Sequence, residues 1–343
     1  MSRPRRIDTH SHFLPDFYRD ALHEAGIDHP DGMPAVPMWS ETEHLKLMDH
    51  LNITKSILSI STPGIDLYAS NPSAAASLAR KVNAFAADLK RRHPTRFGYW
   101  ASLPMPDIAA TLTEIDAALA EGAEGVMFLT NHKGHYLGDK AFAPVFEKLN
   151  QVKARVFIHP TTPCIACEHS AGLGGREGEI VKATPLSWML PNPMMEFFFD
   201  TARTVTDLFL TGRVKANPDI TFIIPHAGGC MPPILSRFTG FAGAVPDAGI
   251  DPDINETKVR EAFNRQFYFD MAGFVFPGQI YGLLIGCGVG KDRLLYGSDY
   301  PYTPFAAAVK LADLCDGGTE AWSGEEREMA YFGNAIRLLG EEK

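Results

Sequence analysis

Five side chains that can bind a metal ion or carry a proton stand at the ends of short apolar runs in this sequence. The first run ends with His10 and His12, and three later runs end with His159, His226 and Asp299. Imidazole and carboxylate are ligands that Zn²⁺ and its first-row neighbours take in proteins. A lone His-x-His pair is weak evidence, but five such groups at the ends of buried strands need partners. The sequence therefore predicts a metal site where these strands end.

The segments that must position these side chains alternate between β-type runs and helical patterns. The candidate strands are Arg6–His12, Ser56–Ser61, Phe97–Leu103, Gly125–Thr130, Arg155–His159, Thr221–His226, Gln266–Met271 and Leu294–Asp299. The helical patterns are Glu41–Leu51, Ser73–Arg92, Asp107–Glu121, Lys140–Gln151, Pro193–Val214, Met231–Phe241, Gly278–Gly286, Phe305–Cys315 and Glu325–Leu339. Several runs are continuously apolar, as expected for parallel strands buried on both faces. This α/β alternation predicts a closed (β/α)₈ TIM barrel, which would gather all five side chains at its C-terminal mouth.

The composition is that of a globular protein, and we expect residues 1–343 to form a single barrel domain. Of the 343 residues, 45% are hydrophobic and 21% charged, which excludes intrinsic disorder. The formal net charge of −9 and the scattered basic residues argue against nucleic acid as a partner. No apolar run predicts a membrane span, and no secretory signal is visible. The odd, scattered set of cysteines suits a reducing compartment, so we expect a cytoplasmic protein.

Four segments along nearly the whole chain carry these side chains in a recognisable order. They are Asp8–Phe13, Phe157–Pro160, Ile224–Gly229 and Tyr296–Pro301. As a set they resemble the amidohydrolase superfamily, and more narrowly its branch of aminocarboxymuconate-semialdehyde and ortho-hydroxybenzoate decarboxylases. Within that branch the chain is most similar to the 6-methylsalicylate decarboxylase type. The resemblance implies a metal-dependent TIM barrel of the amidohydrolase type.

The resemblance also implies one divalent metal ion. The sequence has no Rossmann fingerprint and no P-loop, so we expect no organic cofactor. The ligands that the resemblance implies are His10, His12, His159 and Asp299. His226 would be a catalytic histidine beside the metal. Ligation rich in histidine favours Zn²⁺, with Mn²⁺ as the alternative. Binuclear amidohydrolases use a lysine at the end of the fourth strand, whereas here Lys133 lies beyond that end.

Substrate contacts and assembly follow from the same resemblance. Arg237 matches an arginine that reaches a neighbouring subunit's site and grips a substrate carboxylate, which implies a homodimer or homotetramer. Trp188 and Tyr302 match aromatic positions that line the pocket. We expect Phe13 and Phe274 to add to these apolar walls.

The expected reaction is the non-oxidative decarboxylation of a small aromatic acid such as 6-methylsalicylate, with release of CO₂ and a phenol. The phenol proton would pass to Asp299, which would then protonate the ring carbon that bears the carboxylate. No arginine lies between Arg19 and Arg80, where the semialdehyde enzymes carry a second carboxylate-binding arginine, and this argues against a dicarboxylate. The alternative is a mononuclear hydrolase that attacks an amide, lactone or C–C bond with a metal-bound hydroxide.

Two long loops follow the first and fifth strands, His12 to about Ser40 and Pro160 to about Pro191. In a barrel both lie over the C-terminal face, and long loops in a compact domain are usually functional. The second loop is rich in glycine, at positions 172, 174, 175 and 178, so it could be a mobile lid or a static surface loop.

Two smaller groups of polar residues lie near the predicted mouth. Cys164, Cys167 and His169 resemble half of a zinc site but lack a clear second half, so we expect free thiols. His132 and His135 follow the fourth strand, and we expect them to be solvated loop residues rather than pocket residues.

Overall fold

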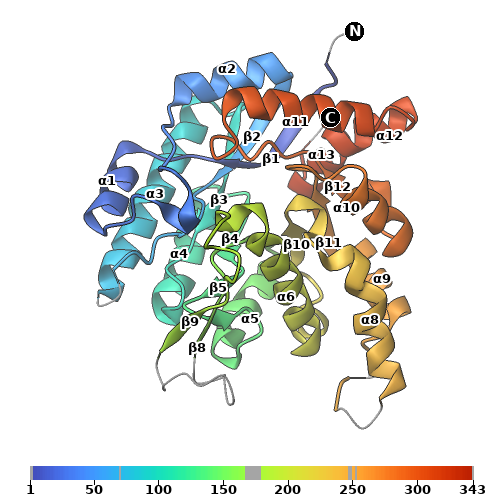
Figure 1. The fold of residues 1–343 in the computed structure, drawn as a ribbon. Helices are drawn as coiled ribbons and strands as arrows, with labels where there is room; N and C mark the ends of the chain where they lie inside the picture. Colours follow the sequence, from blue (N-terminus) through green and yellow to red (C-terminus); the bar gives the residue numbers. More distant parts are fainter. Residues whose placement is uncertain (1–2, 69–70, 167–178, 246–248, 252, 342–343) are drawn as a thin grey trace.

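The computed structural model describes residues 3–68, 71–166, 179–245, 249–251 and 253–341 (Figure 1). Within them eight strands pair in sequence order: β1 (Arg6–His12), β2 (Ile53–Ser59), β3 (Phe97–Ser102), β4 (Gly125–Leu129), β7 (Arg155–His159), β10 (Thr221–Ile224), β11 (Phe267–Asp270) and β12 (Leu294–Leu295). All the neighbouring pairs are parallel. A parallel bridge between Asp8 and Tyr296 joins the last strand to the first. The predicted (β/α)₈ barrel is therefore confirmed.

Helices surround the strands on the outside of the barrel (Figure 1). The longer ones are α2 (Glu41–Leu51), α3 (Pro72–Arg92), α4 (Ile108–Ala120), α6 (Glu196–Leu210), α8 (Met231–Ala244), α9 (Glu256–Gln266) and α11 (Phe305–Gly318). The shorter ones are α1 (Asp16–Glu24), α5 (Ala143–Gln151), α7 (Arg213–Ala216), α10 (Gly278–Tyr281), α12 (Gly324–Glu328) and α13 (Asn334–Leu339). Several begin at side-chain caps that the sequence provides; Ser40, Asn71 and Asp107 each accept a backbone N–H of the first turn.

Side chains alternate between the barrel interior and the helical layer along each strand. In β4, Met127 and Leu129 belong to the cluster inside the barrel, whereas Val126 and Phe128 face the helices. This period of two is the ordinary geometry of a β-strand, and bulky apolar side chains fill the centre of such barrels. The interior is therefore packed, and only the ends of the strands are free to build a site.

Several element boundaries differ from the sequence prediction. The predicted helix 193–214 is divided between α6 and α7, because Gly212 has a left-handed φ of 71°. The last strand ends at Leu295 rather than Asp299, since Asp299 itself has a φ of 57° and leaves the extended conformation. Helices α1 and α9 were not predicted.

Two short hairpins stand at the C-terminal ends of β4 and β7. One pairs β5 (Asn131–His132) with β6 (His135–Tyr136), and the other pairs β8 (Cys164–Ala166) with β9 (Ile180–Lys182). Among the described residues, no helix combines the length and apolarity that a bilayer crossing requires.

Candidate metal centre and active site

Four of the predicted side chains converge at the C-terminal mouth of the barrel. His10 and His12 lie at the end of β1, and His159 is the last residue of β7. Asp299 comes from the loop after β12. One ligand atom from each of the four lies within 4.8 Å of the others. The three imidazoles are buried and the carboxylate is partly exposed, so these atoms enclose a small polar space that opens to one side.

His10 shows most directly what this space requires. Its Nδ1 donates to Oδ2 of Asp270 at 2.9 Å, which fixes the ring and leaves Nε2 facing the other ligand residues. That Nε2 is buried and has no hydrogen-bond partner, and it lies 3.5 Å from Oδ1 of Asp299. Leaving a buried ring nitrogen without a partner is costly, whereas a cation bound at Nε2 would satisfy it. The residues present therefore fit a metal ion.

His12 and His159 are oriented in the same way. Nδ1 of His12 lies 3.1 Å from Oγ and 3.3 Å from the carbonyl oxygen of Ser59, and its Nε2 lies 3.1 Å from Oδ1 of Asp299. Nδ1 of His159 donates to the carbonyl oxygen of Pro160 at 2.8 Å. In all three imidazoles Nδ1 faces an oxygen atom, so Nε2 is the nitrogen that a metal would bind, as is usual for histidine ligands.

The charge states also suit metal binding. Burial lowers the pKa of His12 and, with the neighbouring imidazoles, holds the pKa of His159 well below its usual range, so both rings are neutral. Burial raises the pKa of Asp299, but the hydrogen bond with His12 and the adjacent His10 outweigh it and hold that pKa well below its usual range. Deprotonated ligands of this kind are those that a divalent cation needs.

The backbone around the site adopts conformations that L-residues seldom take. His226 and Asp299 have φ values of 52° and 57°, in the left-handed region. Asp270 supports the turn at His226, because its Oδ1 accepts the backbone N–H of His226 at 3.0 Å. Strained residues of this kind cluster at functional sites, where the surrounding structure holds them. Here the turns bring Nε2 of His226 to 3.9 Å from Oδ2 of Asp299.

A cavity of about 490 Å³ opens directly above these residues. Its polar floor includes His159, His226 and Asp299. Most of its other walls are apolar or aromatic and include Met33, Met194, Phe197, Phe198, Phe274 and Tyr302. A space of this volume, with few polar groups at one end, suits a single aromatic ring that carries a polar head.

The predicted binding residues do not all reach this cavity. Tyr302 lines it and packs edge-on against the His12 ring, with centroids 5.5 Å apart, and Phe274 lines its outer part. Phe13 instead lies in the core, stacked on Phe85 with centroids 6.0 Å apart. Trp188 is 79% exposed and does not line the cavity of its own chain.

Arg237 is exposed on α8, and it too does not line the cavity of its own chain. Phe13 and Trp188 were predicted to form apolar walls of the cavity, but Phe197 and Phe198 on α6 form such walls instead. These two residues were not identified from the sequence. Asp270 was also missed, although it ends the seventh strand. The other site residues were identified as polar residues at the ends of buried strands, and Asp270 ends β11 in the same way.

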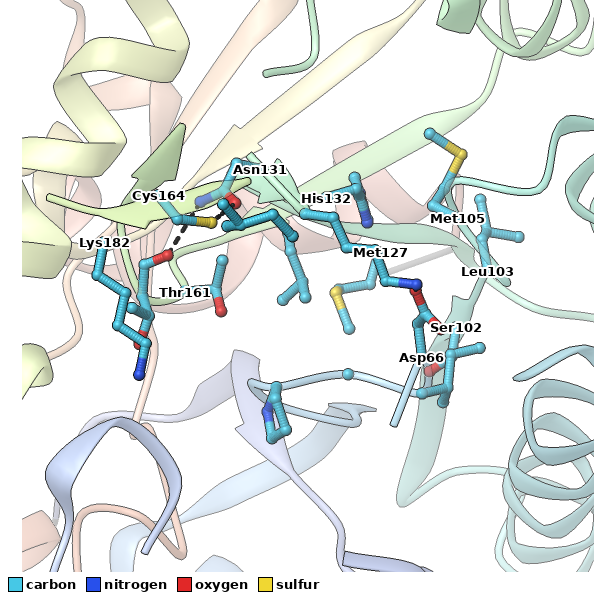
Figure 2. A pocket seen from close by; sticks show the side chains of 17 residues that line it. Asp66, Ser102, Leu103, Met105, Met127, Asn131, His132, Thr161, Cys164 and Lys182 are labelled. Carbon is cyan, nitrogen blue, oxygen red and sulfur yellow. Dashed lines mark hydrogen bonds and ion pairs between the residues drawn. The ribbon is translucent and has the colours of Figure 1, made fainter. Parts of the chain in front are cut away.

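A second cavity, of about 360 Å³, lies beside the first at the ends of β3, β4 and β7 (Figure 2). His132 lines it but is buried, because its ring packs edge-on against Phe128 and Phe142. The expectation that His132 is solvated is therefore wrong. His135 is partly buried, and its Nδ1 lies 2.8 Å from Oδ2 of Asp139.

Cys164 also lines the second cavity, and its thiol donates to Oδ1 of Asn131 at 2.9 Å (Figure 2). It is a free cysteine, as expected. The other two members of the considered zinc half-site, Cys167 and His169, lie outside the described residues. The glycines of the considered lid, at positions 172, 174, 175 and 178, also lie outside them.

Curated relatives resemble this chain over almost its whole length. Decarboxylase yanB of Aspergillus niger is 37% identical, with 97% of this chain and 87% of that protein covered. The 6-methylsalicylic acid decarboxylase acuB of Aspergillus aculeatus is 33% identical, with 97% of this chain and 96% of that protein covered.

Solved structures share the fold. A crystal structure described as amidohydrolase II has a TM-score of 0.83 at 30% identity, covering 98% of this chain and all of the other. A dihydroxybenzoic acid decarboxylase from Polaromonas, solved with bound manganese and an inhibitor, has a TM-score of 0.76 at 21% identity. That match covers 98% of this chain and 97% of the other. Residues 7–340 match the sequence model of the amidohydrolase family. The chain therefore belongs to the amidohydrolase family, in the branch that contains the 6-methylsalicylic acid and γ-resorcylate decarboxylases.

Proposed function

We propose that this protein is a metal-dependent, non-oxidative decarboxylase of an ortho-hydroxybenzoate such as 6-methylsalicylate or salicylate. The observation that carries the proposal is the buried group of three histidines and one aspartate at the floor of an aromatic cavity. The relatives named as decarboxylases of hydroxylated benzoic acids support the same substrate class. The products would be CO₂ and the corresponding phenol.

The four ligand residues would hold one divalent cation. When bound, this cation would act as a Lewis acid that orients the carboxylate and the ortho oxygen and lowers the pKa of the phenol. Zn²⁺ is our first choice, because three imidazoles and one carboxylate suit it, and Mn²⁺ is the alternative.

Asp299 would carry the proton that the reaction needs. Its pKa is held well below the usual range, so it is a carboxylate at neutral pH and has no proton of its own to give. It would first accept the phenol proton and then deliver it to the ring carbon that bears the substrate carboxylate. Cleavage of the C–C bond then releases CO₂ and restores the aromatic ring. A proton from water completes the phenol product.

His226 would hold the reacting carboxylate. Its Nε2 lies near Asp299 at the floor of the cavity, and its ring packs against Phe198 with centroids 5.4 Å apart. Phe197, Phe198 and Tyr302 would exclude water from the ring, since all three line the same cavity. An apolar wall favours the step in which the localised charge of the carboxylate spreads into the ring as CO₂ departs.

The competing function is a hydrolase that uses the same ligands. Binuclear hydrolases of this superfamily use a lysine at the end of the fourth strand, and here that strand ends in Leu129. Lys133 lies further on, pairs with Asp66 at 2.6 Å and lines the second cavity instead. This arrangement favours one metal ion, and with the decarboxylase relatives it favours decarboxylation over hydrolysis.

The finer predictions about assembly and location form part of the same proposal. We propose a homodimer or homotetramer in which Arg237, exposed on α8, reaches the active site of a neighbouring subunit and binds a substrate carboxylate. We also propose that the protein works in the cytoplasm, because its cysteines are few and scattered.

The test is a substrate panel. Purified protein with Zn²⁺ or Mn²⁺ restored is incubated with salicylate, 6-methylsalicylate and 2,6-dihydroxybenzoate, and separately with simple amides and lactones. The proposal predicts CO₂ and the matching phenol from at least one of the acids. Hydrolysis of an amide or lactone without CO₂ release across the acids would favour the competing function.

A further inference from the structure

Asp31 places a second carboxylate on the wall of the active-site cavity. It lies in the short turn Pro30–Gly32 of the loop after β1, and its φ of 54° is left-handed. The turn lines the same cavity as Asp299 and Tyr302. Burial raises the pKa of Tyr302, and the charges of Asp31 and Asp299 raise it further. Both carboxylates are therefore close enough to Tyr302 to influence the same part of the cavity wall.

The hydrogen bonds around Asp31 all run in one direction. Thr62 Oγ1 donates to Oδ2 of Asp31 at 2.8 Å, and Thr162 Oγ1 donates to Oδ1. Because the Thr62 hydroxyl has already given its single proton, Thr161 Oγ1 must be the donor in its 2.7 Å bond to Thr62. Asn192 Nδ2 donates to Thr162 Oγ1 at 2.9 Å. With Asp31 ionised, two chains of donors therefore end on its carboxylate.

Little positive charge stands against Asp31 inside the cavity. Burial raises its pKa, and the two threonine hydroxyls, the backbone N–H of Thr162 and the more distant Lys182 offset this only in part. Lys182 lines the neighbouring cavity rather than this one (Figure 2). Of the described residues that line the active-site cavity, the one basic side chain besides the two histidines is Lys310, which is exposed to solvent on α11. Water screens an exposed ammonium group, whereas Asp31 is partly buried and acts at lower dielectric.

We propose that Asp31 is a specificity-determining residue that restricts this enzyme to aromatic acids with a single carboxylate. The inference rests on the proposed function. The metal end of the cavity takes the reacting carboxylate, while a second carboxylate elsewhere on the ring meets the negative charge of Asp31, and this chain places no buried lysine or arginine among the described residues that line the cavity. A neutral substituent of the same size, such as a methyl or carboxamide group, meets no such repulsion.

The test uses two inhibitors or substrates of nearly equal shape, 5-carboxysalicylate and 5-carbamoylsalicylate. Both carry the same metal-binding head, and only the first has a second negative charge. The readout is the ratio of their Ki or KM values. In the unmodified enzyme the dianion should bind at least about tenfold more weakly than the amide. Asp31→Asn keeps the size of the side chain and removes its charge, so the ratio should fall by about the same factor.

Thr162→Val is the matched control. It removes one of the hydrogen bonds that hold the loop but leaves the charge of Asp31, so the ratio should stay within about twofold of the unmodified enzyme. If Asp31 only anchored the loop, both variants would shift the affinities of the two analogues together and leave the ratio unchanged. Asp31→Ser provides a second uncharged variant should Asp31→Asn fail to fold.

The outcomes separate this inference from the proposed function. An unchanged ratio in an Asp31 variant that still decarboxylates salicylate would overturn the inference alone. Equal binding of the dianion and the amide by the unmodified enzyme would overturn it as well. Absence of CO₂ release from every acid would overturn the proposed function, and the inference with it.

Discussion

Replacing Asp270 by asparagine should weaken metal binding without disturbing the barrel. Asp270 is fully buried, and its two oxygens accept from Nδ1 of His10 at 2.9 Å and from the backbone N–H groups of His226 and Ala272 at 3.0 Å each. Asparagine has one acceptor oxygen in place of two. That oxygen would serve the two backbone donors, and the new NH₂ group would face His10.

The consequence for His10 is a change of tautomer. An NH₂ group can only donate, so Nδ1 of the neutral His10 ring would become an acceptor and its one proton would lie on Nε2. A protonated Nε2 has no lone pair for a metal ion, and the ring must be returned to the other tautomer before it can bind one. Loss of such a supporting carboxylate costs about 10–100-fold in metal affinity, or about 1.4–2.7 kcal/mol.

The assay is competition for Zn²⁺ between the metal-free protein and a chromogenic chelator. Asp200→Asn is the matched control, because Asp200 is equally buried but accepts from Thr130, Asn131 and Tyr136 and touches no ligand imidazole. The control should lose stability and keep its affinity for Zn²⁺. Unchanged affinity in Asp270→Asn, or an equal loss in both variants, would refute the role assigned to Asp270.

Other perturbations test the remaining parts of the site and the core. Asp299→Asn should lower CO₂ release by at least about 10²-fold even with saturating metal, and near-normal turnover would remove Asp299 from proton transfer. Burial lowers the pKa of His10, but Asp270 raises it to about 9, so Zn²⁺ uptake should release a proton and tighten as pH rises to 9. Titration calorimetry in two buffers of different ionisation enthalpy measures this release, and pH-independent uptake would contradict it. Burial lowers the pKa of His44 to about 3, below the unfolded value of about 6.5, so protonation favours unfolding as pH falls below 6.5. Between neutral pH and pH 5, the unfolding free energy of the unmodified protein should thus fall by about 2 kcal/mol more than that of His44→Gln. Urea unfolding measures both values, and an equal fall in the two proteins would refute this role of His44. Arg237→Ala should raise the KM for the acid by about tenfold or more, since a lost ion pair to a carboxylate weakens binding, and an unchanged KM would contradict that contact.

The metal ligands could be predicted because topology fixes where parallel strands end. His10, His12 and His159 close strands that the apolar pattern identifies, and the ends of such strands must meet at the mouth of a barrel. Asp299 comes from a turn with a left-handed residue, yet its position after the last strand was enough to place it. Asp270 ends β11 in the structure, but the predicted strand ran on to Met271, so Asp270 was not identified as a residue at a strand end.

The walls of the cavity were harder to predict. Phe197 and Phe198 lie on an amphipathic helix, and aromatic side chains in such a helix are ordinarily predicted to pack in the hydrophobic core. Asp31 lies in a loop without periodicity, and only its hydrogen bonds in three dimensions reveal its place. His132 was expected to be solvated because it follows a strand in a polar stretch, but two phenylalanines from distant segments bury it.

The most direct test of the account is the metal content of the active protein together with its activity. We expect about one equivalent of Zn²⁺ or Mn²⁺ per chain by elemental analysis, loss of CO₂ release on chelation, and recovery of CO₂ release when metal is returned. His159→Ala should lose both the bound metal and the activity, because His159 supplies one of the four ligand atoms. Full decarboxylation by protein that contains no bound metal, or metal retained undiminished in His159→Ala, would contradict the account.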